Sequence, residues 1–365
     1  MMCKAAYIHV PFCNSICAYC DFFRCGYNQS LANQWLQAIT KEIPSRLKKG
    51  LQTIYIGGGT PSALNDEQLE ILLQSLHPFA MDCIEYTIES NIESLSDTKL
   101  DIMKKYGINR ISLGVQTLQP ELLTIIHRKH KAKDILTCIH RIHEHDIHNI
   151  SIDLIYGLPH QTLSMWKQDL KTIVDTFPID HISLYALTIE PNSEFGRTGV
   201  QNIDDDVEAD MYEYAISFLE QNGFYQYEIS NFAKVGKASK HNQFYWRYDD
   251  FYGIGCGASG KENHQRYDNT KNLQIYITQG SSPNYIALTK QDEMFEMIMM
   301  SLRMKKGLDM EHFAQVFGVP IYSVYQRAID KNCSSGLLDM KDGFLFATEK
   351  GFAILHEILL DFLPE

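Results

Sequence analysis

Six short runs of apolar, β-branched or aromatic residues alternate with longer amphipathic segments up to about residue 230 of this 365-residue chain. They cover residues 6–10, 53–56, 84–88, 110–114, 151–156 and 181–187. Strands that alternate with helices in this way form parallel sheets. We therefore predict an α/β fold in which six strand-helix units curl into a partial barrel, with the helices outside. Ligands of such folds bind in loops at the carboxyl ends of the strands.

Three cysteines follow the first predicted strand closely. Cys13, Cys17 and Cys20 fall within eight residues. A 4Fe-4S cluster is normally held by four protein ligands, so three thiolates leave one iron open for a small molecule. A zinc site is the alternative, with Cys25 as the fourth ligand, but zinc prefers two close ligand pairs and no second Cys or His pair of suitable spacing follows.

The cysteine spacing and its surroundings resemble the radical S-adenosylmethionine (radical-SAM) superfamily. That resemblance implies a partial (β/α)6 barrel, a 4Fe-4S cluster on Cys13, Cys17 and Cys20, and SAM bound to the open iron. In such proteins the reduced cluster donates an electron to SAM, and the resulting 5′-deoxyadenosyl radical abstracts a hydrogen atom. The protein supplies positioning and excludes side reactions.

A glycine cluster follows the second predicted strand, in the stretch Gly57-Gly-Gly-Thr-Pro-Ser62. Glycine lets backbone approach a neighbour closely. The plain interpretation is a tight turn between strand and helix. The resemblance implies instead that Gly58, Gly59 and Thr60 contact SAM.

Polar residues mark the ends of further predicted strands: Glu89, Gln116 and Asp153, with Arg128 on the helix after Gln116. Each alone is more often a solvated or structural residue, but together they predict a ring of polar groups at one face. They match positions at which the porphyrinogen-related radical-SAM proteins contact SAM. Tyr7, Tyr19 and Ala186 match further SAM contacts of those proteins.

A second informative stretch is Lys240-His-Asn-Gln-Phe-Tyr-Trp-Arg-Tyr248. Imidazole is a common axial ligand of haem iron, and aromatic neighbours can pack against a macrocycle. A core histidine in an aromatic cluster is the alternative. The pattern resembles the haem-binding signature of the HemW-type haem chaperones, which are related to the oxygen-independent coproporphyrinogen III oxidases. This resemblance implies that His241 ligates haem and that Asn242, Tyr245 and Trp246 complete the site.

The glycine run at residues 253–260 comes next. We interpret it as a loop, because no clear strand feeds it and no apolar helix follows, as a dinucleotide site would require. Relatives commonly carry a histidine after the Gly-Ala of this run, where this chain has Ser259.

The pattern becomes helical from about residue 290, with an apolar face that includes Met294, Met297 and Ile298. A short hairpin and a final helix follow, and the whole resembles a small, mainly helical, winged-helix-like carboxyl domain. We expect three parts: a radical-SAM core at 1–235, the haem-signature and connecting region at 236–289, and a HemN-type carboxyl domain at 290–365. The acidic run at 204–206 is expected to be a solvated helix start rather than a metal site.

Charge and cysteine usage limit the possible partners and compartment. With a net charge of −12 we expect no broad basic surface, so nucleic acid is excluded as a partner. An odd count of nine cysteines argues for a reducing compartment and against a disulfide framework. No apolar run approaches the length of a membrane span, and the first residues lack the apolar stretch of a signal peptide. The expected location is cytoplasmic.

Two functions compete on this scaffold. The first is a haem chaperone that binds a 4Fe-4S cluster, SAM and haem and delivers haem to apo-haemoproteins, with membrane-associated respiratory proteins as one candidate client class and a monomer or homodimer as the assembly. The second is an oxygen-independent coproporphyrinogen III oxidase (dehydrogenase). Those oxidases carry another Cys two residues after the third cluster Cys, where this chain has Phe22, and have a long amino-terminal extension. The first function is preferred, and whether the chain is an enzyme is left open.

Overall fold

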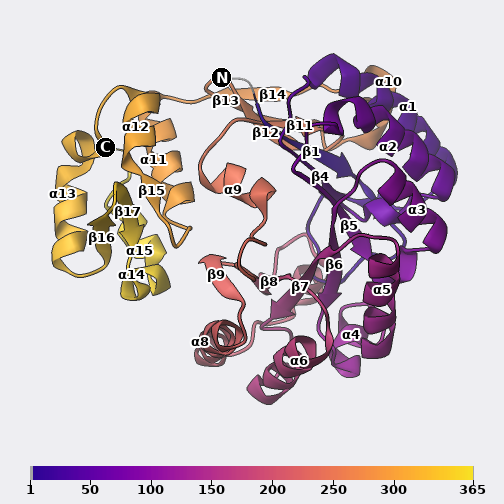
Figure 1. Ribbon diagram of the computed structural model, residues 1–365, viewed down its shortest axis with the longest axis horizontal. Helices are drawn as coiled ribbons and strands as arrows, with labels where there is room; N and C mark the ends of the chain where they lie inside the picture. Colours follow the sequence, from indigo (N-terminus) through magenta and orange to yellow (C-terminus); the bar gives the residue numbers. More distant parts are fainter. Residues whose placement is uncertain (1–2, 365) are drawn as a thin grey trace.

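The computed structural model describes residues 3–364 and contains one large, mostly parallel sheet of twelve strands (Figure 1). Its six central parallel strands follow one another in chain order: β1 (Ala5–Val10), β4 (Thr53–Gly58), β5 (Glu85–Asn91), β6 (Arg110–Gln116), β7 (Asn149–Tyr156) and β8 (His181–Ala186). The six predicted strands and the α/β class are confirmed.

Helices cover the outer face of this sheet, on the right and along the bottom of Figure 1. They are α1 (Gln29–Arg46), α2 (Asp66–Ala80), α3 (Asp97–Lys105), α4 (Pro120–Ile125), α5 (Ala132–Glu144), α6 (Leu163–Thr176) and α8 (Asp205–Gln221), with the shorter α7 (Glu194–Thr198) and α10 (Leu273–Gln279) and the 3-10 turns η1 (Pro61–Ala63) and η2 (Ile92–Ser94). Alternate strand residues such as Ile54, Ile56 and Leu113 are fully buried beneath them in the main core.

Two helix starts follow from local side-chain chemistry. Asn65 caps α2 and Gln68 bonds back to the backbone of Asn65, which together form a capping box. Asp204 caps α8 through the backbone amides of Asp206 and Val207, so the acidic run is a helix start as expected.

The opposite face of the six strands, which we call the inner face, carries the intervening residues and is largely polar. Its members include Thr53, Tyr55, Glu85, Thr87, Glu89, Arg110, Ser112, Ser151, Asp153, His181 and Ser183. When a parallel sheet is covered on both faces, the sequences of its strands are usually continuous runs of apolar residues. The polar inner face therefore marks a surface with a role other than packing.

The interpretation of residues 253–260 as a loop is right only for the middle of the run: residues 255–258 form a turn, whereas both ends of the run belong to strands. β11 (Phe251–Ile254) lies parallel to β1 and leads into this run, and β12 (Ser259–Glu262), β13 (Gln265–Asp268) and β14 (Asn284–Ala287) extend the sheet antiparallel from β11. Gly253 is needed because a Cβ there would meet the Ser259 carbonyl oxygen at 2.0 Å. At the other edge lie β10 (Asn231–Ala233) and β9 (Tyr225–Glu228).

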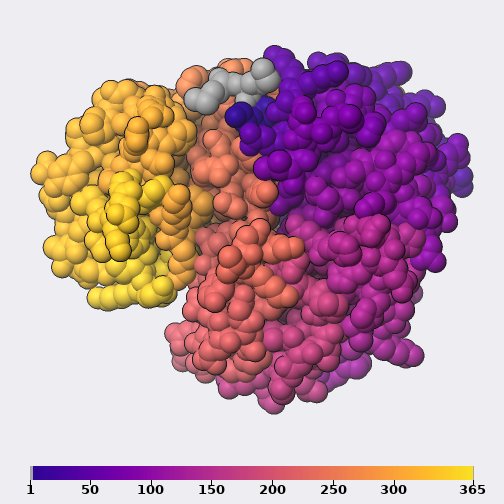
Figure 2. Space-filling model, in the orientation of Figure 1, coloured from indigo at the N-terminus to yellow at the C-terminus, as the bar shows by residue number. Residues whose placement is uncertain are grey.

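The last part of the chain forms a second lobe with its own hydrophobic core, seen on the left in Figure 2. It contains α11 (Lys290–Ser301), β15 (Leu308–Asp309), α12 (Met310–Phe317), α13 (Ile321–Ser334), β16 (Leu338–Lys341), β17 (Phe344–Ala347), α14 (Glu349–Ala353) and α15 (Leu355–Leu360). The strands form a three-stranded antiparallel sheet, so the helical carboxyl part with a hairpin is confirmed.

The expected domain limits at 235 and 289 stay predictions. Tyr252, Ile254 and Tyr276, from the expected connecting region, pack in the core of the barrel, whereas Tyr248 packs in the core of the second lobe. Among residues 3–364, no helix is long and apolar enough to cross a membrane.

Candidate functional site

The three predicted cluster ligands lie in one loop after β1. Cys13 ends the two-residue strand β2 (Phe12–Cys13), which pairs with β3 (Cys25–Gly26), so the loop that carries Cys17 and Cys20 is closed at its base. The backbone amide of Cys20 bonds to the Cys17 carbonyl oxygen at 3.2 Å and tightens the tip. Burial raises the pKa of the Cys13 thiol to about 11, and Thr60 donates toward its sulfur at 3.7 Å.

These thiols have the chemistry that an iron-sulfur cluster needs. All three are free, and each is an electrostatic neighbour of the others. In the part of the chain that the structure describes, no three His, Cys, Asp or Glu residues converge on the position of a single metal ion. A cube of irons takes one thiolate per iron and so spreads its ligands more widely than one ion does. Cys25 packs instead against the main core, near Cys256.

The glycine cluster after β4 lies directly against the cysteine loop. The amides of Gly59 and Thr60 donate to the carbonyl oxygens of Val10 and Phe12, at 2.8 and 2.7 Å. A Cβ on Gly59 would meet the Phe12 carbonyl oxygen at 2.7 Å, and one on Gly58, whose φ is 116°, would meet the His9 ring. The glycines therefore bring the second strand end against the cluster loop, and their predicted contact with SAM stays a prediction.

Glu89 is the nearest inner-face carboxylate to this glycine cluster. It accepts hydrogen bonds from the Gly58 amide at 3.0 Å and from the Tyr55 hydroxyl at 2.9 Å. Burial and the neighbouring Asp153 carboxylate raise the pKa of Glu89 to about 7. Burial also raises the pKa of Asp153, which accepts from the Ser112 hydroxyl at 3.2 Å. Because the two carboxyl groups raise each other's cost of ionisation, this pair suits a cationic ligand.

Gln116 is the strongest sign of a ligand at this edge. It ends β6 with a positive φ of 65° at a register irregularity, and among residues 3–364 its buried side-chain oxygen has no hydrogen-bond partner. Non-glycine residues held in this conformation cluster at ligand sites, and buried polar atoms are normally satisfied. The structure thus contains an acceptor prepared for a group that the protein itself does not supply.

Arg128 and Tyr19 connect this edge to the cysteine loop. The Arg128 guanidinium donates to the Gly114 carbonyl oxygen at 3.4 Å and lies beside Cys17 and Tyr19. Its charge favours thiolate forms nearby. Tyr19 packs with Leu122 in a small satellite core, which anchors the loop.

Two further predicted SAM contacts lie on β1 and β8. The Tyr7 hydroxyl lies 2.9 Å from Nδ1 of His9, and its ring stacks on Tyr55. Ala186 ends β8 and is exposed. The predicted cluster and SAM residues other than Tyr7 therefore lie toward the carboxyl end of the strands or in the segments that follow, whereas Tyr7 lies within β1.

The haem signature lies elsewhere, on the short helix α9 (Lys240–Trp246), which packs on the inner face near the start of the strands. Glu85 holds the start of this helix: it accepts from the hydroxyl of Ser239 at 3.0 Å and from the amides of Lys240 and His241, both at 2.8 Å. Tyr55 lies between the signature and the SAM residues, because its ring stacks on both His241 and Tyr7 and its hydroxyl donates to Glu89.

His241 is fully buried, and both of its ring nitrogens are engaged. Nδ1 lies 2.9 Å from the Thr53 hydroxyl and Nε2 lies 2.7 Å from the Tyr245 hydroxyl, while the ring stacks on Tyr55. Burial, with a smaller contribution from Arg110, lowers the pKa of His241 to about 3. This is the geometry of a core histidine in an aromatic cluster, and iron ligation by His241 requires one hydroxyl to leave.

The other signature residues point in different directions. Trp246 contacts the second lobe: Ser301 donates to its carbonyl oxygen at 3.1 Å, and the Arg303 guanidinium lies 4.7 Å from its ring centroid. Asn242 is half-buried near the start of α9, where its amide donates to the Ser239 hydroxyl. The four side chains do not converge on one point. The signature therefore defines the helix α9 and not a single ligand-binding position.

Comparison with known proteins assigns the family. Residues 7–173 match the Radical SAM superfamily model, and residues 288–354 match the HemN C-terminal domain. The chain is 34% identical to "Heme chaperone HemW" of Bacillus subtilis, over 99% of this chain and 100% of that protein. It is 30% identical to the protein of the same name from Escherichia coli, over 98% of each chain. The chain belongs to the radical-SAM HemW family.

A solved structure supports the fold of this HemW-family chain. Coproporphyrinogen III oxidase (HemN) of Escherichia coli, described as a radical SAM enzyme, superposes with a TM-score of 0.85 at 24% identity, over 99% of this chain and 90% of that one. The partial radical-SAM barrel with its carboxyl domain is therefore confirmed.

The sequence did not single out several inner-face residues of this family member. Glu85, Thr53 and Tyr55 hold α9, and the fully buried Arg110 lies near Tyr55 and His241, with a guanidinium Nε that has no partner in the described part of the chain. A signal was available, because these polar side chains occupy every second position of strands whose other positions are apolar.

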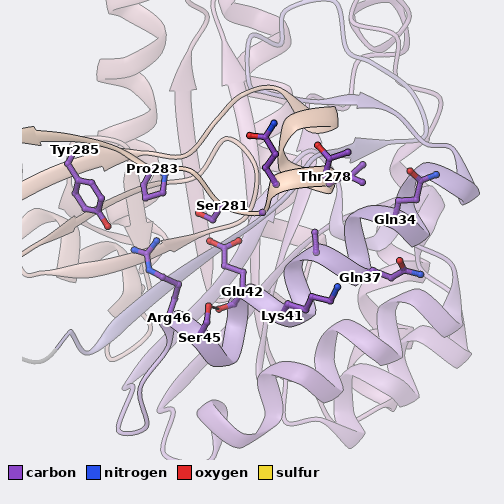
Figure 3. Close-up of a pocket in the computed structure, with 14 residues that line it drawn as sticks. Gln34, Gln37, Lys41, Glu42, Ser45, Arg46, Thr278, Ser281, Pro283 and Tyr285 are labelled. Atoms are coloured by element: carbon purple, nitrogen blue, oxygen red, sulfur yellow. Dashed lines mark hydrogen bonds between the residues drawn. The ribbon is translucent and has the colours of Figure 1, made fainter.

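A pocket of about 730 Å³ on the outer side of the barrel is separate from these residues (Figure 3). It lies between α1 and the segment from α10 to β14, and its side chains include Glu42, Arg46 and Tyr285. Glu42 accepts from the Tyr276 hydroxyl at 2.5 Å and from the Gly255 amide at 3.2 Å, so it ties α1 to the turn after β11. None of the predicted site residues lines this pocket.

Proposed function

We propose that this protein is a haem chaperone that binds a 4Fe-4S cluster, SAM and haem and delivers haem to haemoproteins. The observation that carries the proposal is the match over nearly the whole chain to proteins named heme chaperone HemW, including those of Bacillus subtilis and Lactococcus lactis. A match of this extent includes the cysteine loop, the inner face and the second lobe together.

The cluster would be held by Cys13, Cys17 and Cys20, and SAM would bind at the carboxyl end of the inner face. When bound, the cluster supplies one-electron chemistry toward SAM. The chain's own residues would orient the ligand: Glu89 and Asp153 suit its positive charges, and the unpartnered oxygen of Gln116 would accept a hydrogen bond. Arg128 would stabilise the thiolates beside it.

Phe22 supports a chaperone over a coproporphyrinogen III oxidase. It stands where those oxidases carry an additional cysteine, and its side chain is 70% exposed. An exposed aromatic side chain beside the cluster loop provides no thiol and is suited to contact an apolar surface. The superposition with HemN shows a shared fold, and fold alone does not decide function.

We further propose that the clients are apo-haemoproteins and that the protein works in the reducing cytoplasm. All nine cysteines are free, as a reducing compartment would maintain them. Acidic composition fits protein clients rather than nucleic acid.

The deciding experiment is an anaerobic incubation of cluster-reconstituted protein with SAM, a reductant and coproporphyrinogen III. We expect no loss of carbon dioxide by mass spectrometry, and transfer of bound haem to an apo-haemoprotein in a parallel assay. Robust decarboxylation with release of 5′-deoxyadenosine would make the protein an oxidase instead. Iron and sulfide analysis of the same sample shows that the cluster is intact.

A further inference from the structure

A basic segment adjoins the cysteine loop, and apart from Arg128 none of its residues belongs to the predicted SAM site. Residues 127–131, between α4 and α5, read His-Arg-Lys-His-Lys in a chain whose net charge is −12. Together with Pro120, Leu123, Thr124 and Ser15 of the cysteine loop, they line a pocket of about 600 Å³, which we call the basic pocket.

The lysines give the basic pocket its outward charge. No carboxylate lines the pocket. Lys129 and Lys131 are exposed, and within residues 3–364 neither makes an ion pair. Lys133, in the first turn of α5, is exposed and unpaired in the same part of the chain. On an acidic protein, such a group of cations creates a local field of opposite sign to the rest of the surface.

Most carboxylates around the pocket are engaged. Glu194 lies 3.6 Å from the His127 ring, and Glu93 lies 3.3 Å from the His130 ring. Asp134 accepts from the backbone amide that begins α5, at 2.8 Å. Glu121, next to Pro120, is exposed and makes no ion pair among the residues described, so it opposes the charge of the lysines.

The basic pocket lies close to the predicted cluster ligands. Ser15 is two residues from both Cys13 and Cys17, and two residues of chain span at most about 7 Å. Arg128, which also lines the pocket, is an electrostatic neighbour of the same two cysteines. Ile16, beside Ser15, is 44% exposed and adds an apolar contact. Electron transfer between proteins weakens steeply with distance, so a carrier bound here would be well placed to exchange an electron with the cluster.

The proposed cluster gives up one electron to SAM and has to be reduced again by a donor. An acidic donor is attracted by the lysines of the basic pocket and repelled by the negative charge of the chain elsewhere. A hollow with Leu123 at its surface and cations around it fits a flat apolar edge that is surrounded by acidic residues. A protein-bound flavin whose ring edge is exposed on an acidic protein presents that combination.

We propose that the basic pocket and Ile16 form the docking surface for an acidic flavoprotein that reduces the cluster. One electron passes from the reduced flavin to the cluster, so the flavin is oxidised by one electron and the cluster is reduced by one. Lys129 and Lys131 pair with acidic side chains of the partner. The inference rests on the cluster of the proposed function and is independent of haem delivery.

The test follows anaerobic reduction of the reconstituted, full-length protein by reduced flavodoxin, a small acidic flavoprotein, through the visible absorbance of the cluster. We compare wild type with the double variant Lys129→Glu/Lys131→Glu at about 0.01 M and about 0.15 M salt, where the Debye length is about 30 and about 8 Å. At the lower salt concentration the variant should react roughly tenfold more slowly or less, an effect within the range of electrostatic steering. The difference should shrink at the higher concentration. Calorimetry with oxidised flavodoxin measures docking without electron transfer and should show the same order of affinities.

Two further variants serve as controls. Lys48→Glu/Lys49→Glu makes the same change in net charge at two exposed lysines that precede β4, at the amino end of the strands, and should react as wild type does. Glu121→Lys should react faster than wild type, a gain that misfolding does not produce. Dithionite, a small reductant that needs no docking surface, should reduce every variant at the same rate. Iron and sulfide analysis verifies the cluster in each.

The outcomes separate the docking surface from the proposed function. Equal slowing by the two double variants would show that only net charge matters and would overturn the docking surface. Failure of flavodoxin to bind and reduce a wild-type protein that dithionite reduces would overturn it as well, and reduced ferredoxin would then show whether the donor is of another kind. The chaperone function would stand in both cases. A wild type that holds no iron or sulfide after reconstitution would contradict the proposed function itself.

Discussion

The hydroxyl oxygen of Tyr245 lies 2.7 Å from Nε2 of His241, one turn earlier on α9. With Thr53 bonded to Nδ1, the neutral imidazole donates one hydrogen bond and accepts another, and no lone pair is free for a metal. The aromatic residues of the signature thus stabilise a helix that joins the barrel to the second lobe.

We expect His241→Ala to weaken haem binding while leaving the cluster intact. The substitution removes a stacked, doubly bonded ring and leaves two buried hydroxyls unpaired, which should lower the free energy of unfolding by about 2–4 kcal/mol. Hemin titration together with iron and sulfide analysis provides the measurement. An unchanged titration would remove His241 from the haem site altogether.

Tyr245→Phe separates a ligand role of His241 from a positioning role. The variant releases Nε2, so a histidine that ligated iron would bind haem more tightly after the change. We expect no gain in hemin affinity and a loss of about 1–2 kcal/mol in the free energy of unfolding, from the unpaired imidazole. A clear gain in hemin affinity would identify His241 as the iron ligand.

Cys17→Ala should abolish the visible absorbance of the reconstituted cluster, because it removes one of three thiolates in the loop. Cys25→Ala is the matched control, since this thiol packs against the core near Cys256 and should leave iron and sulfide content unchanged. Retention of full iron and sulfide in the Cys17 variant, or their loss in the Cys25 variant, would contradict the assignment.

SAM affinity should rise with pH through the neutral range. The pKa of Glu89 is raised to about 7 by burial and Asp153, so the carboxyl is neutral below that pH and charged above it. A cationic ligand should therefore bind roughly tenfold more tightly at about pH 8 than at about pH 6. Anaerobic calorimetry measures this dependence. Glu89→Gln should flatten it, and a slope that persists in this variant would assign the titration to another group.

Glu85→Gln should destabilise the protein through the start of α9. The buried carboxylate accepts from the Ser239 hydroxyl and from the amides of Lys240 and His241, and a carboxamide accepts with only one of its two polar atoms. We expect a loss of about 1–3 kcal/mol in the free energy of unfolding by urea titration. Glu349→Gln, which changes an exposed partner of Lys305, should have an effect near zero. Equal effects of the two variants would contradict the capping role of Glu85.

Much of the fold could be predicted because it depends on local patterns. Apolar alternation defined the six central strands, and Asn65 and Asp204 marked helix starts by their own capping chemistry. β11 was missed because Phe251–Ile254 is four residues long and contains a glycine. Its partner β1 lies near the beginning of the chain, so no local sequence pattern indicates that β11 pairs with β1.

The candidate site was likewise predictable only where it depends on residues that are close in sequence. Cys13, Cys17 and Cys20 are close in sequence, so their spacing alone predicted one loop. The state of His241 depends on Thr53, from a strand far earlier in the chain, and on the capping of α9 by Glu85. Only the tertiary structure shows that the ring is enclosed.

Helix α9 has one side on the barrel's inner face and the other against the second lobe. Groups that are joined through one short helix do not respond independently. Substitutions of Thr53, which bonds to His241, and of Ser301, which donates to the Trp246 carbonyl oxygen, should therefore change the free energy of unfolding by amounts that do not add.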